Sequence, residues 1–194
     1  MNEALAYWRQ LQAEVADSGA WTARVLEQEM RTGLQYQGKA AMLVAEPQLL
    51  TEAELADDQS VASAVVATLV AAGRQLLADP ALQNRYTPGW LDGVPDADLF
   101  SVPAGYPDPI VFGRLDGVRT PDGLRVLEFN GGLPGGILPA DASAALMAST
   151  DIAQQFGERH PFRITTAGDA VLDAMVKTWH DFGGSGLPYT VVAM

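Results

Sequence analysis

Near its middle the chain reads Val111-Phe-Gly-Arg-Leu-Asp-Gly-Val-Arg-Thr-Pro-Asp-Gly-Leu-Arg-Val-Leu-Glu-Phe-Asn130, and this stretch decides the fold. Two β-prone runs flank Pro121, Asp122 and Gly123. Proline presets the first turn residue, aspartate suits the second, and glycine accepts the left-handed third position. These are the residues of a three-residue hairpin loop with a glycine bulge, so the stretch predicts an antiparallel hairpin.

The predicted turn fixes which residues face each other across the hairpin. If Thr120 pairs with Leu124, then Asp116 lies opposite Glu128. Two carboxylates directly across a ladder lie about 5 Å apart and repel each other. A divalent cation between them removes that repulsion and takes their oxygens as ligands. The register therefore predicts a metal site at Asp116 and Glu128.

Arg114 and Asn130 extend this candidate site. The same register places them opposite each other, and period-two alternation puts them on the face of Asp116 and Glu128. Asn130 contributes a neutral oxygen, and Arg114 can hold a phosphate or acyl-phosphate that the metal also touches. The other face is expected to carry Leu115, Leu127 and Phe129.

A plain alternative is an exposed hairpin whose polar face is covered by water. Arg114 would then pair with Asp116 or Glu128, as surface ions commonly do with little gain in stability. The spacing of the residues leaves both interpretations open.

A family resemblance favours the metal site. Arg114-Leu-Asp116, then Leu124-Arg-Val-Leu-Glu-Phe-Asn130 and a Gly/Pro-rich loop, resembles the closing motif of ATP-grasp enzymes. It looks like the circularly permuted branch, similar to glutathione synthetase and glutathionylspermidine synthase-like proteins. In that branch the motif comes early and much of the nucleotide-binding machinery comes later. The detailed resemblance covers about Val111 to Gly136, and the rest of the chain agrees in broad layout.

The resemblance implies a role for each residue of the motif. Glu128 and Asn130 match the family's magnesium ligands, and Asp116 matches the acidic residue that supports the same metal cluster. Arg114 matches the arginine that contacts phosphate or the acylated intermediate. The implied cofactors are Mg²⁺ and ATP.

The glycine-rich loop after the hairpin is a candidate cofactor-binding segment, with Gly131, Gly132, Gly135 and Gly136 as its residues. Its backbone amides can cradle a carboxylate or phosphate, as glycine-rich loops ahead of helices do. A flexible connection between strand and helix is an equally good interpretation. The loop departs from the Ser- or Thr-containing loops of many relatives, and it lacks the ending of a P-loop.

Composition narrows the partners. The 194 residues include 24 acidic and 12 basic side chains, a formal net charge of −12. Nucleic acids and anionic membranes attract basic residues, so neither is an expected partner.

Cysteine is absent, which excludes disulfides and thiol catalysis. The N-terminus lacks a signal-peptide pattern, and no uninterrupted apolar stretch approaches about 18 residues, so we expect a cytoplasmic protein.

The rest of the sequence predicts an α+β fold, an ATP-grasp-like lobe in which helices pack against an antiparallel sheet. Apolar residues recur at helical spacing around Trp8 and again around Trp21, and both stripes are expected in the core. Thr51 and Glu54 form a capping box at the start of the longest helix, which runs to about Leu77. Further expected elements are a small hairpin within 34–44, a long loop at 86–109, helices at 139–147 and from 165 or 166 to about 182, and a buried strand at 189–194.

Residues 1–182 are expected to form the N-terminal part of a permuted ATP-grasp-like domain, and residues 183–194 the start of a following α/β unit. Because the chain ends within a predicted strand, we expect it to hold only part of an active site and to be inactive alone.

The function implied by the resemblance is part of an ATP- and Mg²⁺-dependent carboxylate–amine ligase. It would join a small-molecule acid and amine through an acyl-phosphate. A second hypothesis is a non-catalytic binding or regulatory module that keeps the ATP-grasp lobe fold and has no magnesium affinity. A third is an unrelated nucleotide-binding α/β protein that uses the Gly131–Gly136 loop after a parallel strand. A homo-oligomer is compatible with the sequence, which does not fix the oligomeric state.

Overall fold

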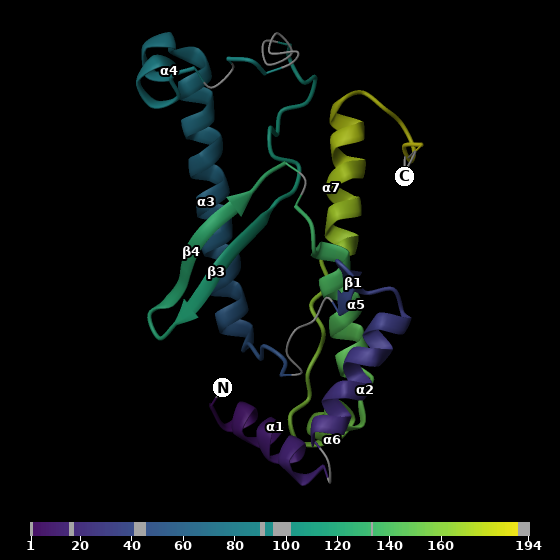
Figure 1. Cartoon of the computed structure of the whole chain (residues 1–194). Coiled ribbons are helices and arrows are strands. Elements are labelled where there is room, and N and C mark those ends of the chain that lie inside the picture. The colour runs from purple at the N-terminus through teal and green to yellow at the C-terminus, as the bar shows by residue number, and fades with distance from the viewer. Residues whose placement is uncertain are drawn as a thin grey trace. The chain divides into compact units, whose positions relative to one another are not determined.

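The computed structural model describes residues 2–15, 18–40, 46–89, 92–94, 102–132 and 134–189. Within them, helices alternate with two antiparallel pairs of strands, which confirms the α+β class (Figure 1). In chain order the elements are α1 (Asn2–Glu14), α2 (Ser18–Arg31), β1 (Gln35–Tyr36), β2 (Lys39–Ala40), α3 (Glu52–Ala78), α4 (Pro80–Tyr86), β3 (Arg114–Thr120), β4 (Gly123–Asn130), α5 (Ile137–Ala148), α6 (Asp151–Arg159) and α7 (Gly168–Asp181).

Contacts divide the chain into two compact units, each built from two separate stretches of sequence. Unit 1 comprises Met1–Leu55 and Pro134–Ala170, and unit 2 comprises Ala56–Leu133 and Val171–Met194. The domain boundary expected after residue 182 stays a prediction. The strand expected at 189–194 lies outside the described residues apart from Tyr189.

The hydrophobic core of unit 1 combines α1 and α2 with α5 and α6. Trp8 and Trp21 are 2% and 3% exposed, so both predicted core stripes are confirmed. Phe156 packs edge-on against Trp8, with ring centroids 5.5 Å apart. It comes from α6, a helix that the sequence analysis did not predict. The cluster consists of Trp8, Leu11, Trp21, Val25, Met147, Ile152, Ala153 and Phe156.

Two local predictions in the first half of the chain are confirmed. The small hairpin pairs Gln35 with Ala40, and its turn at Gln37 and Gly38 has φ angles of 52° and 75°. Such positive values at both turn residues match the twist of the flanking strands. The capping box is also present, since the Thr51 amide donates to the Glu54 carboxylate at 2.8 Å and the Glu54 amide donates to Thr51 Oγ1 at 3.2 Å.

Helix α3 dominates unit 2. None of its residues, all of which the structure describes, is buried. By length and composition alone, α3 is long and apolar enough to cross a membrane. Its first half is tied to the β3–β4 hairpin by an ion pair of 2.6 Å between Asp58 and Arg119, so helix and hairpin lie side by side (Figure 1).

Candidate metal and phosphate site

The turn of the β3–β4 hairpin is one residue shorter than the sequence predicts. Thr120 pairs with Gly123 instead of Leu124, so only Pro121 and Asp122 form the loop. The predicted three-residue loop is therefore wrong. Gly123 keeps the left-handed conformation expected of it, with φ of 106°, but it does so as the first residue of β4.

A bulge further along the hairpin offsets the short turn. Gly117 pairs with Val126 and Asp116 pairs with Glu128, which leaves Leu127 as an extra residue on β4. An extra residue on one strand of an antiparallel pair shifts the register by one position. Asp116 therefore still faces Glu128, as predicted, while the bulged Leu127 is 70% exposed and does not join an apolar face.

Two glycines let β4 come close to β3 at this point. A Cβ atom on Gly117 would lie 2.8 Å from Leu124 Cδ1 and 2.9 Å from the Arg125 carbonyl oxygen. A Cβ atom on Gly113 would lie 2.6 Å from Cζ of Phe129. A larger residue at Gly117 would push the strands apart, because the Arg125 oxygen belongs to the backbone, whereas one at Gly113 would require the Phe129 ring to move.

The structure brings the four predicted site residues together on one face of the hairpin. Arg114 donates to both oxygens of Asp116, from Nε to Oδ1 at 2.6 Å and from Nη2 to Oδ2 at 2.9 Å. The same Nη2 lies 4.0 Å from Glu128 Oε1. Asn130 Nδ2 donates to that Glu128 oxygen at 2.9 Å. The Arg114–Asp116 and Asn130–Glu128 contacts each lie within one strand, and the Arg114–Glu128 contact crosses from β3 to β4.

The charges on this face stabilise one another. The pKa of the Asp116 carboxyl lies below its usual value, chiefly because Arg114 donates hydrogen bonds to it, and desolvation opposes that shift. The pKa of the Arg114 guanidinium is raised in turn, mainly by Asp116. Both side chains are only partly exposed, 39% for Arg114 and 35% for Asp116, so water reaches the pair. Asp116 thus carries its full negative charge at neutral pH.

The carboxylate oxygens suit a hard cation that also keeps water or phosphate ligands. Asp116 and Glu128 face each other across the hairpin, and Asn130 contacts Glu128 through its amide nitrogen, so the ligands that the carboxylates offer a metal are oxygens. Mg²⁺ is usually held by one or two carboxylates together with substrate phosphates, whereas an all-protein cage needs more ligands. In the described part of the chain no three His, Cys, Asp or Glu side chains gather as a metal cage. Binding of Mg²⁺ by this hairpin stays a prediction.

The glycine-rich loop is divided between the two units. Gly131 and Gly132 follow β4 in unit 2, and Gly135 and Gly136 precede α5 in unit 1. Gly136 has φ of 89° and is the residue at the N-terminal cap of α5. Cofactor binding by these four glycines stays a prediction.

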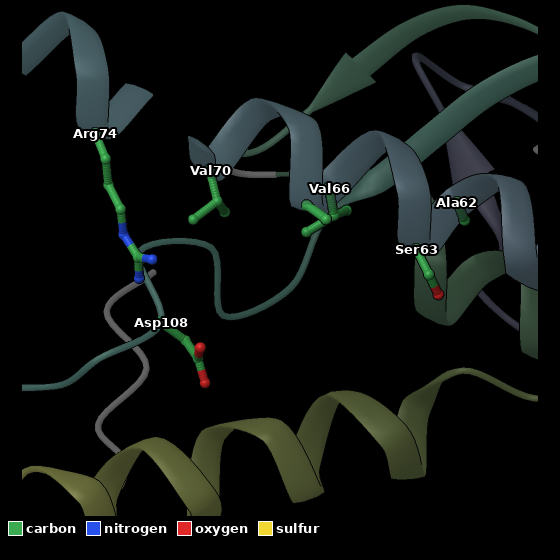
Figure 2. A pocket seen from close by; sticks show the side chains of 7 residues that line it. Ala62, Ser63, Val66, Val70, Arg74 and Asp108 are labelled. Atoms are coloured by element: carbon green, nitrogen blue, oxygen red, sulfur yellow. The ribbon is translucent and has the colours of Figure 1, made fainter. Parts of the chain in front are cut away.

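A hollow of about 550 Å³ runs along α3 in unit 2, apart from the predicted site residues, none of which lines it. Figure 2 shows Arg74 extending from α3 toward the segment that carries Asp108. Arg74 donates to the Pro107 carbonyl oxygen at 3.2 Å, and Asp108 accepts from Lys177 at 3.0 Å. The polar groups at this hollow are thus engaged with the protein. Its lining is Ala62, Ser63, Val66, Ala67, Val70, Arg74 and Asp108.

Sequence reasoning missed the ion pair that holds the hairpin on α3. The side chains of Arg119 and Asp58 are 15% and 20% exposed, so the pair is largely shielded from water. Alternation along β3 puts Arg119 on the face opposite Asp116, with Leu115. A cation on the apolar face of a strand signals a buried partner, but the sequence does not say that the partner lies 61 positions away.

The chain matches no family model, no curated protein and no solved structure. A function is therefore proposed from two grounds, the geometry of the hairpin and the resemblance of its motif.

Proposed function

We propose that the chain supplies the magnesium and phosphate end of an ATP-dependent carboxylate–amine ligase of the permuted ATP-grasp type. The observation that supports this is the pairing of Asp116 with Glu128 across the hairpin, with Arg114 and Asn130 on the same face. We also propose that the α+β fold is an ATP-grasp-like lobe.

Each side chain has a physical task in this reaction. In the proposed ligase a carboxylate of the acid attacks the terminal phosphorus of ATP, which gives an acyl-phosphate and ADP. The amine then displaces phosphate and forms the amide. Asp116, Glu128 and Asn130 would hold Mg²⁺, which neutralises charge on the phosphoryl group when bound. Arg114 would orient the phosphate through paired N–H donors, and so align two anions that otherwise repel.

We also propose that the chain works in the cytoplasm and that α3 stays out of membranes. Asp58 on α3 is paired with Arg119 of the hairpin, and separating them to enter a bilayer would leave both charges without this partner. The net charge of −12 also opposes binding to anionic lipid.

The proposal is tested by titrating Mg²⁺ into the whole chain in the presence of a non-hydrolysable ATP analogue, with heat as the readout. We expect Asp116→Asn and Glu128→Gln each to weaken Mg²⁺ binding by at least about tenfold, because each removes a negative oxygen ligand. Asp122→Asn is the matched control. It removes the same charge from the turn of the same hairpin, where the side chain is 79% exposed, and it should leave binding unchanged.

Two results would count against a ligase site. If the unaltered chain binds no Mg²⁺ with the analogue, the hypothesis of a non-catalytic module that keeps this fold is favoured. If Asp122→Asn weakens binding as much as Asp116→Asn, the effect is one of net charge and the facing carboxylates have no special role.

A further inference from the structure

The contact between Arg114 and Asp116 occupies the oxygens that a metal would use. Arg114 donates one hydrogen bond to each Asp116 oxygen, at 2.6 and 2.9 Å. This is the paired geometry in which a guanidinium binds a carboxylate most strongly. Asn130 donates to Glu128 Oε1 at 2.9 Å, and Arg114 Nη2 lies 4.0 Å from the same oxygen. Arg114 thus lies where a cation between the two carboxylates would be attracted.

A guanidinium and a divalent cation compete for these positions. A metal held by both oxygens of a carboxylate takes the inward-facing lone pair of each oxygen, and on Asp116 the paired Arg114 hydrogen bonds take those positions. Two positive groups at the same oxygens also repel each other. A metal that ligates both Asp116 oxygens therefore has to displace Arg114, and a metal that ligates one of them is repelled by the guanidinium.

The displaced guanidinium stays close to the metal, because Arg114 and Asp116 are two residues apart on β3 and so about 7 Å apart along the strand. There it faces the metal with its donors released from Asp116. A phosphate that also ligates the metal satisfies both cations at once, since phosphate accepts the same paired N–H bonds as a carboxylate.

We propose that Arg114 acts as an internal competitor of the metal, so that the hairpin binds a metal–phosphate complex well and the free metal poorly. The inference rests on the proposed function, which supplies the metal and the phosphate. It adds that Arg114 has two alternative partners, the Asp116 carboxylate before binding and a phosphate after it. The two ligands then strengthen each other's binding by the same factor, as thermodynamic linkage requires.

The test uses the whole chain, with Mg²⁺ and inorganic phosphate as probes. Calorimetric titration of Mg²⁺ without phosphate should show tighter binding to Arg114→Gln than to the unaltered chain, by about fivefold or more. Adding phosphate should strengthen Mg²⁺ binding to the unaltered chain more than binding to Arg114→Gln, where phosphate contacts the metal but has lost the guanidinium. Phosphate binding followed by ³¹P NMR should show the reciprocal effect of Mg²⁺.

Two further variants distinguish competition between Arg114 and the metal from a general loss of positive charge or a loss of folding. Arg125→Gln removes an arginine from β4 whose side chain is 63% exposed and 3.5 Å from Asp122, and it should change neither affinity more than about twofold. Arg114→Lys keeps the charge but loses the paired donors, so its affinity for Mg²⁺ alone should lie between those of the unaltered chain and Arg114→Gln. Far-ultraviolet circular dichroism checks that each variant is folded.

These titrations distinguish failure of the competition by Arg114 from failure of the proposed metal site. If the unaltered chain binds Mg²⁺ and Arg114→Gln binds it equally or more weakly, the competition is overturned and the metal site stands. If no variant binds Mg²⁺ with or without phosphate, the metal site and the competition both fall.

Discussion

At the scale of single residues, Glu29 shows how a polar group is held inside the core of unit 1. It lies on α2 with none of its surface exposed, and its carboxyl accepts a hydrogen bond of 2.8 Å from Ser143 Oγ on α5. Glu29 continues the stripe of Trp21 and Val25 at a spacing of four, so its burial follows from the sequence pattern. Its partner does not, because Ser143 is 114 positions away.

Removing this hydrogen bond should destabilise unit 1. We expect Ser143→Ala to lower the free energy of unfolding by about 1–3 kcal/mol, since a buried polar group loses a partner. Urea unfolding followed by tryptophan fluorescence measures the change. Ser149→Ala serves as control, because its hydroxyl is exposed and bonds only the nearby Leu146 carbonyl. Equal effects of the two substitutions would mean that the Glu29 contact contributes nothing specific.

At the scale of elements, helices and strands were predictable where local chemistry decides them, and less so where packing does. The capping box of α3 and both turn glycines follow from side-chain chemistry a few residues apart. The length of the β3–β4 turn was predicted wrongly, because Pro-Asp-Gly suits two-residue and three-residue loops alike. Helix α6 was missed, although Thr150 caps it by accepting from the Ala153 amide. Its nine residues, Asp151–Arg159, fall short of the window of about 11–18 residues over which helical periodicity is usually read.

The bulge gives a prediction that involves no charged residue. Gly117→Ala would place a Cβ atom 2.9 Å from the Arg125 carbonyl oxygen, so the strands must separate or change register. We expect it to lower the free energy of unfolding by about 1–3 kcal/mol and to weaken Mg²⁺ binding, because Glu128 no longer faces Asp116. Urea unfolding and calorimetric titration measure the two effects.

Gly73→Ala adds the same methyl group in α3, where no atom lies within 4 Å, and it should not affect Mg²⁺ binding. If Gly117→Ala leaves Mg²⁺ affinity intact, metal binding does not depend on the register of this hairpin.

At the scale of the whole molecule, the buried apolar residues are unevenly distributed. The described cluster of buried side chains lies entirely in unit 1. In unit 2, helices α3, α4 and α7 contain no buried residue along their described lengths. The stripes around Trp8 and Trp21 predicted the first two helices of this core, but which helices complete it depends on contacts between distant parts of the chain.

This distribution predicts a difference in local stability. Amide hydrogens of α3, α4 and α7 should exchange with solvent faster than those of α1, α2 and α6, because few buried contacts oppose local opening. Hydrogen exchange followed by mass spectrometry at neutral pH resolves these segments. Protection of α3 equal to that of α6 would show that something covers α3 in solution, such as a second copy of the chain.

The short turn and the bulge of the β3–β4 hairpin also bear on how such chains can diverge in length. A descendant that gains one residue between Thr120 and Gly123 and loses the extra one at Leu127 would keep Asp116 across from Glu128. Either change alone also keeps the two facing, because a residue added at the turn stays in the loop, and loss of Leu127 leaves Glu128 next to Val126, the partner of Gly117. Related chains can therefore differ by one residue at either place and still keep the acidic pair, so an alignment gap at the turn or at Leu127 does not by itself mean that the pair is lost.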